Sequence, residues 1–408
     1  MSESTIHFWD FPVSIHLRFS DSFRARFFSQ AIRFFGSSIK TGAFLNSVAG
    51  QKGLKRSAYA SGLRQQKCSQ RIFFPAWAVA ALSHETGMDL FSIEREIVAY
   101  RAKGGLSFSK QLPISVGPEF VGIMAHLMGD GSDKVTRRGA ARYAQVSLLG
   151  RQKFKEKMVA AFGLPSEEVI SRDGKTVFIP AAAMTVIKAR FPEARFGTYE
   201  SFVPEAIKNG ERSWRLAFLS AFLVDEGSLY ESISIRTKNK TLIQGLLELA
   251  EGLDYSCSKM KIFVDWSGTP VFGFDIRNSS AADLLRDINS LAACHPSCDL
   301  AQKQNQLEFI ASLKRGSLKT RLEGETKKLA LAALSEGPKT AMDIARLLGV
   351  CRRTVRTHLN DLEASDMVSQ VGWRGRGKTW QLAQFHKTSL TNTSASSTPW
   401  SESTNTLP

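Results

Sequence analysis

The sequence of 408 residues contains no apolar run of the length that crosses a bilayer. Its longest apolar stretch, residues 72–82, contains Pro75 and is far shorter than the ~20 residues that a membrane-spanning helix needs. The amino terminus also lacks the short basic region and apolar core of a secretory signal. We therefore expect a cytoplasmic protein with no membrane partner.

Cysteine is scarce, and histidine shows no metal-ligand spacing. Five cysteines, an odd and scattered set, argue against a disulfide framework and indicate reduced thiols. One cluster could suggest zinc, Cys294-His295-Pro296-Ser297-Cys298, but no second pair of ligands lies nearby, so we expect a helix end and a turn there. No Ser-His-Asp spacing supports hydrolysis by a serine nucleophile.

Acidic residues are outnumbered by basic ones. The chain has 54 Lys and Arg against 38 Asp and Glu, which gives a net charge of +16 and a pI near 9.7. This balance favours a polyanionic partner such as nucleic acid. Apolar residues make up 43% of the chain, enough for packed cores, so the protein is not disordered overall.

Two short stretches of the chain repeat each other. Residues 123–131 are IMAHLMGDG and residues 219–227 are LSAFLVDEG, so each stretch ends in an acid followed by glycine. Apolar residues precede each acid with helical spacing, which predicts that Asp130 and Glu226 lie at helix C-termini. Small residues that let two helices approach closely recur at Ala125, Ala221 and Gly129. If these helices pack side by side, both carboxylates emerge together at one end.

The segments after the two stretches also correspond. Residues 145–148 and the helical stretch to residue 164 match residues 232–235 and the helical stretch from residue 242 to 253. Residues 175–179 stand where residues 270–274 stand in the second copy. This pattern indicates an internal duplication.

The duplicated acid-Gly motif resembles the LAGLIDADG homing endonucleases in their single-chain, two-motif form, over roughly residues 118–292. The chain departs from the family motif at four helix positions and at neither acid: His126, Met128, Phe222 and Val224. The resemblance implies an α+β fold with a pseudo-twofold duplicated αββαββα core and flanking all-α and winged helix-turn-helix modules. It further implies a monomeric, intron-encoded, site-specific endonuclease that cuts double-stranded DNA.

The expected organisation has five segments: residues 1–112, a helical module; 113–200 and 201–314, the two repeats; 325–385, a winged helix-turn-helix; and 386–408, a disordered tail rich in Ser, Thr and Asn. Two interpretations of the first segment stay open. It resembles a helix-turn-helix of the phage-repressor type with residues 54–65 as the groove helix, or it is a solvated basic helical cap.

Asp130 and Glu226 are the predicted metal ligands and catalytic residues. Two carboxylates brought together can hold Mg²⁺, as a two-metal or shared-metal site, which activates water and relieves charge on the phosphorane. Carboxylates at helix C-termini oppose the helix dipoles, and this cost argues for a function. Asp225 would point about 100° away from Glu226 and is expected to be secondary. In the family, basic residues polarise the scissile phosphate, and the candidates here are Lys261, Arg277 and Lys175.

Strand alternation predicts the DNA-binding residues of the two repeats. In residues 142–148, Ala144, Val146 and Leu148 share one face, which leaves the other face to Tyr143, Gln145 and Ser147. In residues 230–236, the polar face consists of Tyr230, Ser232, Ser234 and Arg236. Such faces suit the major groove of duplex DNA, although plain solvent exposure is the alternative. A hairpin tip adds phosphate contacts from Arg137 and Arg138.

The last third of the chain has the pattern of a winged helix-turn-helix of the bacterial and archaeal regulator type. We expect helices at residues 326–334, 340–350 and 352–364, and a wing hairpin at residues 367–382. The third helix begins with arginines placed for phosphates and base edges: Arg352, Arg353 and Arg356. The wing tip suits a minor groove or backbone through Arg374, Arg376 and Lys378.

The leading hypothesis is therefore a metal-dependent DNA endonuclease. One alternative is a transcription regulator that uses the same scaffold to bind DNA without cleavage. The other is an RNA-splicing maturase, with intron RNA as the partner. An acid in both copies favours the nuclease, because a pure binder has no need for two carboxylates close to DNA phosphates.

Overall fold

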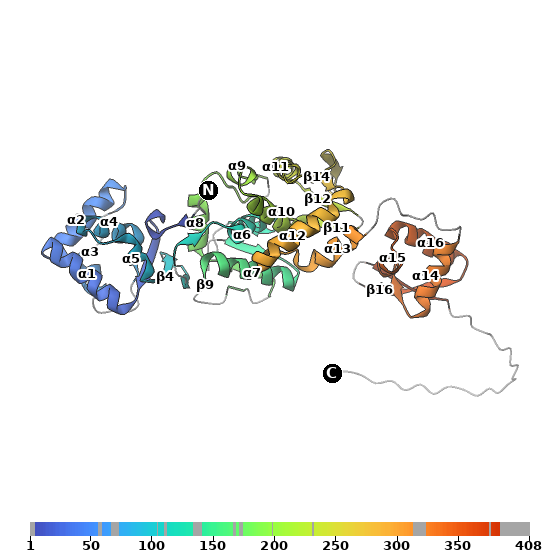
Figure 1. The fold of residues 1–408 in the computed structure, drawn as a ribbon, viewed down its shortest axis with the longest axis horizontal. Helices are drawn as coiled ribbons and strands as arrows, with labels where there is room; N and C mark the ends of the chain where they lie inside the picture. Colours follow the sequence, from blue (N-terminus) through green and yellow to red (C-terminus); the bar gives the residue numbers. More distant parts are fainter. Residues whose placement is uncertain are drawn as a thin grey trace, which may run out of the picture. The chain divides into compact units, whose positions relative to one another are not determined.

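The computed structural model describes residues 5–55, 59–66, 73–103, 105–109, 112–133, 141–165, 169–170, 174–197, 199–230, 232–312, 324–374 and 377–383. The chain divides into two compact units, a core unit of residues 1–315 and a C-terminal unit of residues 316–408 (Figure 1). Both units combine helices with strands, so the protein is of the mixed α+β class. No helix among these residues has the length and apolarity to cross a membrane.

Two helices pack against each other inside the core unit, α6 (Pro118–Gly129) and α10 (Arg212–Glu226) (Figure 1). Both are buried over most of their length, as helices that are apolar all round must be. Ala125 and Ala221 are at most 1% exposed, in agreement with close packing through small residues. Asp130 is the C-cap of α6 and Glu226 is the last residue of α10, so both helices end where the sequence predicted.

The same order of helices and strands follows each of these helices. After α6 come β7 (Gly131–Ser132), β8 (Ala141–Ala144), α7 (Leu148–Phe162), β9 (Leu164–Pro165), β10 (Thr176–Ile179) and α8 (Ala181–Arg190). After α10 come β11 (Gly227–Leu229), β12 (Ile233–Thr237), α11 (Lys240–Glu251), β13 (Lys261–Val264), β14 (Pro270–Ile276) and α12 (Ala281–Cys294). Two short helices lie outside this pattern: α9 (Glu205–Lys208) and α13 (Gln304–Ser312).

Two antiparallel sheets have matching strand orders, β7-β8-β10 in the first half and β11-β12-β14-β13 in the second. Their registers also match at the glycine that follows each acid. Gly131 pairs with Tyr143 across β7 and β8, and Gly227 pairs with Ile235 across β11 and β12. Tyr143 therefore corresponds to Ile235 in the fold.

The segment before α6 contains a sheet, so the expectation of an all-helical module is wrong there. A five-stranded sheet has the order β3-β2-β4-β5-β9 and includes β2 (Ile15–Phe19), β3 (Phe74–Pro75), β4 (Ile97–Ala102) and β5 (Ser107–Ser109). The same segment contains α1 (Asp21–Phe35), α2 (Ser38–Gln51), α3 (Tyr59–Gln66), α4 (Ala76–Thr86) and α5 (Leu90–Arg95), of which α4 contacts β2 and β3. The buried and half-exposed side chains alternate along β2, which is the period of a strand.

Strand pairing also crosses the boundary expected at residue 112. β1 (Thr5–Ile6) pairs with β6 (Ile114–Ser115), and β5 pairs with β9 of the first repeat. The expected groove helix at residues 54–65 corresponds in part to α3, which begins at Tyr59; residues 56–58 lie outside the described part of the chain.

The C-terminal unit follows the predicted pattern. Its elements are α14 (Glu325–Ser335), β15 (Lys339–Thr340), α15 (Ala341–Leu348), α16 (Arg352–Ala364), β16 (Val368–Arg374) and β17 (Gly377–Leu382). Thr340 and Asp343 form a capping box at the start of α15, and Gly349 ends this helix with φ of 60°. Val355, Leu359 and Trp380 are buried in a small core between α16 and the wing strands. The expected tail at residues 386–408 lies outside the described residues.

Replacing the glycine after either acid with alanine should destabilise the core unit. A Cβ on Gly131 would lie 2.4 Å from the Cα of Leu127, and a Cβ on Gly227 would lie 2.5 Å from the carbonyl oxygen of Leu223. The backbone must move to relieve these contacts, so Gly131→Ala and Gly227→Ala should each cost about 1–3 kcal/mol in the free energy of unfolding. Denaturant-induced unfolding measures the loss.

Gly50→Ala is the matched control for these substitutions. Gly50 lies in α2, and a Cβ there would meet no atom within 4 Å. This variant should be neutral or stabilised by up to about 1 kcal/mol, because alanine favours helix more than glycine does. Equal unfolding free energies for all three variants would contradict the steric explanation.

Candidate active site at the ends of two packed helices

Asp130 and Glu226 lie close enough for their charges to interact. The charges of Asp225 and Glu226, together with burial as the largest cause, raise the pKa of the Asp130 carboxyl to about 7. Burial and then the charge of Asp225 raise the pKa of Glu226. The packing of α6 on α10 therefore brings the two predicted acids to one place, with a third carboxylate beside them.

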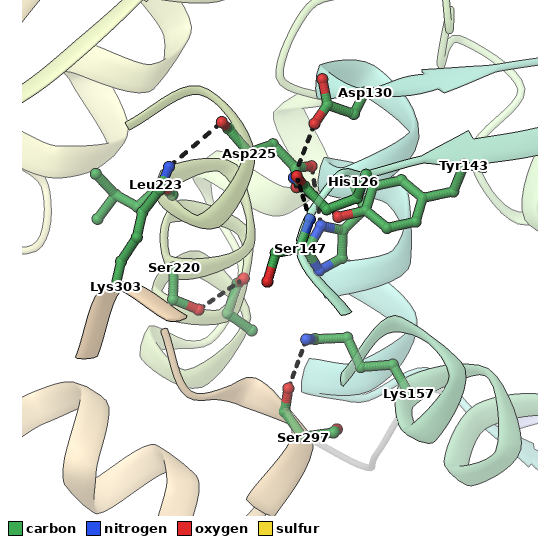
Figure 2. A network of polar contacts seen from close by, with 12 residues as sticks. His126, Asp130, Tyr143, Ser147, Lys157, Ser220, Leu223, Asp225, Ser297 and Lys303 are labelled. Carbon is green, nitrogen blue, oxygen red and sulfur yellow. Dashed lines mark hydrogen bonds and ion pairs between the residues drawn. The ribbon is translucent and has the colours of Figure 1, made fainter. Parts of the chain in front are cut away.

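Asp225 is the centre of a buried polar network, a structural role that the sequence did not predict for it. Its side chain is 0% exposed. His126 Nδ1 lies 2.9 Å from Asp225 Oδ2, and the hydroxyl of Tyr143 donates to Asp225 Oδ1 at 2.6 Å (Figure 2). Asp225 lies in the last turn of α10 and faces α6, since a Cβ on Gly129 would lie 3.0 Å from Asp225 Oδ2.

Gln145 joins Asp225 to Asp130. Its amide nitrogen Nε2 donates to Asp130 Oδ2 at 2.9 Å and lies 3.4 Å from Asp225 Oδ1. A side-chain amide between two carboxylates satisfies acceptors on both and fixes the direction in which the Asp130 carboxylate points. Gln145 was predicted as a DNA contact, and the structure places it against the acids instead.

His126 is held in one neutral form. A carboxylate only accepts hydrogen bonds, so Nδ1 of His126 carries a proton and donates it in a hydrogen bond to Asp225 Oδ2. Burial lowers the pKa of His126, which keeps the imidazole neutral. Its other nitrogen, Nε2, is buried without a hydrogen-bond partner among the described residues. His126 is thus a fixed donor to Asp225.

Lys303 is a site residue that the sequence did not indicate. It precedes α13, and its Nζ donates to the carbonyl oxygens at the end of α10: Gly227 at 2.6 Å, Leu223 at 2.8 Å and Asp225 at 3.3 Å. Figure 2 shows Lys303 beside Leu223 and Asp225. Its charge also lowers the pKa of Asp130 and Glu226, opposing the stronger effect of burial. A cation at a helix C-terminus offsets the helix dipole, which partly explains how acids are tolerated there.

The acids fit a divalent cation. Carboxylate oxygens are the ligands that Mg²⁺ prefers, and Mg²⁺ commonly uses one or two carboxylates with water and phosphate oxygens. The raised pKa values of Asp130 and Glu226 mean that Lys303 leaves negative charge uncompensated. No group of three or more His, Cys, Asp or Glu side chains is arranged as metal ligands in the described part of the chain. Asp130 and Glu226 remain the predicted ligands of such an ion.

The predicted faces of β8 are reversed. Tyr143 is fully buried, whereas Val146 and Leu148 are 85% and 72% exposed. Tyr143 stacks on Phe154 with ring centroids 4.3 Å apart, and its hydroxyl donates a hydrogen bond to Asp225 inside the core. The aromatic ring of Tyr143 is therefore buried in place of the smaller apolar side chains of the other face. The exposed residues of this strand are Arg142 and Ala144.

Ser147 was also predicted as a DNA contact and has a structural role. It is the N-cap of α7, where its hydroxyl accepts a hydrogen bond from the backbone N–H of Gly150 at 3.2 Å. Short polar side chains satisfy unpaired N–H groups at helix starts. The exposed segment that follows β8 is therefore a helix start and not a continued strand.

The polar face of the second sheet is partly as predicted. Ser232 and Arg236 are exposed, but Ser234 is only 4% exposed and accepts a hydrogen bond from Arg236 Nε at 3.2 Å. Tyr230 is 47% exposed and lies just beyond the end of β11. Ser234 is therefore covered by its neighbours, and its role as a DNA contact stays a prediction.

The predicted basic catalytic residues have other partners. Lys261 pairs with Asp275 at 2.5 Å, and Arg277 donates from Nε to the carbonyl oxygen of Cys257 at 3.3 Å. Lys261 begins β13 and Arg277 follows β14 of the second sheet, and Lys175 is exposed next to β10. The cation whose charge acts on Asp130 and Glu226 is Lys303.

The remaining predicted residues divide into described and undescribed ones. Arg353, Arg356 and Lys378 are exposed in the C-terminal unit, and Arg352 is half-exposed. Outside the description lie Arg137, Arg138, Arg376 and the side chain of Arg374. His295 Nδ1 lies 2.9 Å from Glu119 Oε1, so the Cys-His-Cys cluster is a helix end joined to α6, as expected.

A family model described as a winged helix-turn-helix matches residues 327–383. A comparison of the sequence with curated proteins gives no match. Among solved structures, mesophilic variants of the homing endonuclease I-DmoI are 17% identical, with a TM-score of 0.31 over 42% of this chain and 97% of that one. A variant of I-DmoI with its target DNA and manganese is 13% identical, with a TM-score of 0.32 over 44% of this chain and 96% of that one. I-DmoI with DNA and calcium is 16% identical, with a TM-score of 0.32 over 47% of this chain and 98% of that one.

The stability of the core unit should depend on pH through Asp130. Its folded-state pKa of about 7 lies above the ordinary value of 3.8, so between these values the folded protein holds a proton that the unfolded chain has released. The contribution of Asp130 to stability is therefore present at low pH and is lost as pH rises toward 7. Asp130→Asn should gain stability relative to the parent over this window, measured by denaturant unfolding from pH 4.5 to 8.5.

Magnesium should reverse this difference. An ion that binds the folded state alone stabilises it, so Mg²⁺ at pH 8 should raise the unfolding midpoint of the parent more than that of Asp130→Asn. Asp254→Asn is the control, because it removes an exposed carboxylate that pairs with Arg212 at the other end of α10. A gap between parent and Asp130→Asn that does not change with pH would contradict the assignment.

Proposed function

We propose that the core unit is a metal-dependent, site-specific endonuclease that cuts double-stranded DNA, and that the C-terminal unit adds DNA contacts. The observation that carries the proposal is the meeting of Asp130 and Glu226 at the ends of α6 and α10. Buried carboxylates with raised pKa values destabilise a folded protein at neutral pH. A cation site is the arrangement that explains this cost.

The chemistry assigned to the site is hydrolysis of a phosphodiester. A divalent cation held by Asp130 and Glu226 would supply activation of water and neutralisation of charge on the phosphate. Gln145 keeps the Asp130 carboxylate directed by its hydrogen bond at 2.9 Å. Lys303 holds the end of α10 in place through three carbonyl oxygens. The chain's residues thus fix the ligands before DNA arrives.

The DNA would lie along the polar faces of the two sheets. Arg142 of β8, Arg236 of β12 and Lys261 of β13 are exposed. In the second sheet, Arg236 and Lys261 both pair in register with Gly273 of β14. Antiparallel sheets with one covered face can present the other to a ligand. The net charge of +16 supplies the attraction for a polyanion. Lys261 and Arg277 fit backbone contacts better than a role at the acids.

A non-cleaving regulator is the second candidate. The match of residues 327–383 to a winged helix-turn-helix model favours it, since that module serves DNA binding in many regulators. The two candidates share DNA as the partner and differ in what they require of the core unit. Only cleavage needs Asp130 and Glu226 to be ionised together next to a phosphate.

Cleavage should depend on both acids. Purified protein with a randomised duplex library and Mg²⁺ should yield defined double-strand cuts, detected by sequencing the new ends. Asp130→Asn and Glu226→Gln should each reduce cutting by at least about 100-fold while DNA binding persists, because each removes a metal ligand. Asp254→Asn should cut at the parental rate. Selective binding with no cutting at any Mg²⁺ or Mn²⁺ concentration would establish the regulator instead.

The helix α16 should contribute phosphate or base contacts. Arg356 is exposed on α16, and Lys328 is exposed on α14 of the same unit, so Arg356→Gln and Lys328→Gln remove the same charge from different helices. Loss of a phosphate contact should lower the slope of log affinity against log salt by about 1 for Arg356→Gln. Fluorescence anisotropy over a salt series measures this slope. An equal change in both variants would show that α16 has no special place in binding.

A further inference from the structure

We propose that Asp225 is a positioning residue that makes the Asp130 half of the site chemically unlike the Glu226 half. This inference rests on the proposed nuclease function and extends it. It arises from comparing the two halves of the core unit position by position. The comparison uses the acids, the strand register and the helix caps to decide which residues correspond.

The helix positions correspond through the acids. Since Asp130 and Glu226 both end their helices, Gly129 corresponds to Asp225 and His126 corresponds to Phe222. In the sheets, Tyr143 corresponds to Ile235, so two residues further on Gln145 corresponds to Thr237. The N-caps Ser147 and Asn239 correspond, which makes Lys157 the counterpart of Leu249.

Among the described residues, the side chains hydrogen-bonded to the Asp225 carboxylate belong to the first half. Asp225 interacts with four residues of the first half: His126, Tyr143, Gln145 and Lys157. Their counterparts in the second half are, in the same order, Phe222, Ile235, Thr237 and Leu249. Three of these counterparts are apolar, and the fourth is a threonine. Each polar side chain therefore occurs where the extra carboxylate can reach it. If the four polar residues were placed in the core by chance, there would be no reason for all of them to lie in the half that Asp225 faces.

Gly129 makes the crossing of Asp225 possible. A Cβ on Gly129 would lie 3.0 Å from Asp225 Oδ2 and 3.1 Å from Asp225 Cβ, so a larger residue would displace the carboxylate. Gly129 is the counterpart of Asp225 but has no side chain, so no equivalent carboxylate extends from α6 toward the second half. The glycine and the aspartate thus form a complementary pair across the helix contact, and the asymmetry follows from this one exchange.

The charge of a buried cation in the first half, Lys157, acts on Asp225. Lys157 is 1% exposed, its charge interacts with that of Asp225, and its Nζ donates to the carbonyl oxygen of Ser297 at 2.5 Å (Figure 2). Buried charges are stable only when they are paired and hydrogen-bonded. Leu249 needs no such partner, and it is 1% exposed in the core of the second half.

Asp225 acts on the site through Gln145. Both of its carboxylate oxygens have hydrogen-bond partners in the first half, Oδ2 to His126 and Oδ1 to Tyr143. Gln145 is therefore held between Asp225 and Asp130, and it directs the Asp130 carboxylate. Thr237 has a shorter side chain and cannot bridge two carboxylates in this way. One acid of the pair is consequently oriented by a neighbour that the other acid lacks.

The first test measures metal binding without DNA. Mn²⁺ binding to the protein alone is followed by electron paramagnetic resonance for the parent, Asp225→Asn, Gln145→Leu and Thr237→Val. Asp225→Asn and Gln145→Leu should weaken binding by about 10-fold or more, as loss of residues that orient metal ligands does, while Thr237→Val stays within about 2-fold. Gln145→Leu removes no charge, so its loss separates positioning from electrostatic attraction. Unchanged affinity in both variants would overturn the proposal.

The second test measures the two DNA strands separately. A duplex substrate that carries a different dye on each strand gives a separate cleavage rate for each strand. Asp225→Asn and Gln145→Leu should change the ratio of the two rates by about 10-fold, whereas Thr237→Val should not. An equal fall on both strands would show that Asp225 is only structural and would overturn the proposal. Unfolding curves measure whether each variant is folded. If Asp225→Asn does not fold, Gln145→Leu still tests the proposal.

The two tests also separate this proposal from the nuclease function. If the parent binds Mn²⁺ and cuts no duplex, the endonuclease assignment fails and the Mn²⁺ affinities of the variants decide the role of Asp225. If the parent neither binds Mn²⁺ nor cuts, both proposals are wrong.

Discussion

The close contact between α6 and α10 is the constraint on which the rest of the core unit depends. Small residues at the contact bring the helix backbones together, and glycine follows each acid because a Cβ there would collide with the preceding turn. The chain must then turn at once from helix into strand, at Gly131 and Gly227. The same geometry that closes the core thus places two carboxylates at the start of two sheets.

This arrangement has an electrostatic cost. Three carboxylates meet at the C-terminal ends of helices, where the helix dipoles already disfavour negative charge. The protein reduces the cost with Lys303 at the end of α10 and with buried donors around Asp225, yet the pKa of Asp130 is still raised to about 7. A structure built for stability alone would replace these groups with apolar ones. The remaining imbalance is what a bound cation would relieve.

The two halves share their order of elements, their strand register and their helix caps, and they differ in the side chains beneath the acids. A duplicated fold needs the backbone pattern to be equal in both halves, because the same helix contact must be made from both sides. It does not need equal chemistry. The difference between Gly129 and its counterpart Asp225 shows how a single position can give the two halves different chemistry on the same backbone.

Local patterns in the sequence determined the helix ends at Asp130 and Glu226, the small residues at the helix contact and the helices of the C-terminal unit, since helical period, capping and glycine act over a few neighbouring residues. Only the tertiary structure decided which face of β8 is buried, because Tyr143 and Val146 compete for the core and the paired hydroxyl of Tyr143 settles it. The same holds for Asp225 and Lys303. Their partners lie about 80 to 100 residues away along the chain, and no local pattern records which distant atoms will meet.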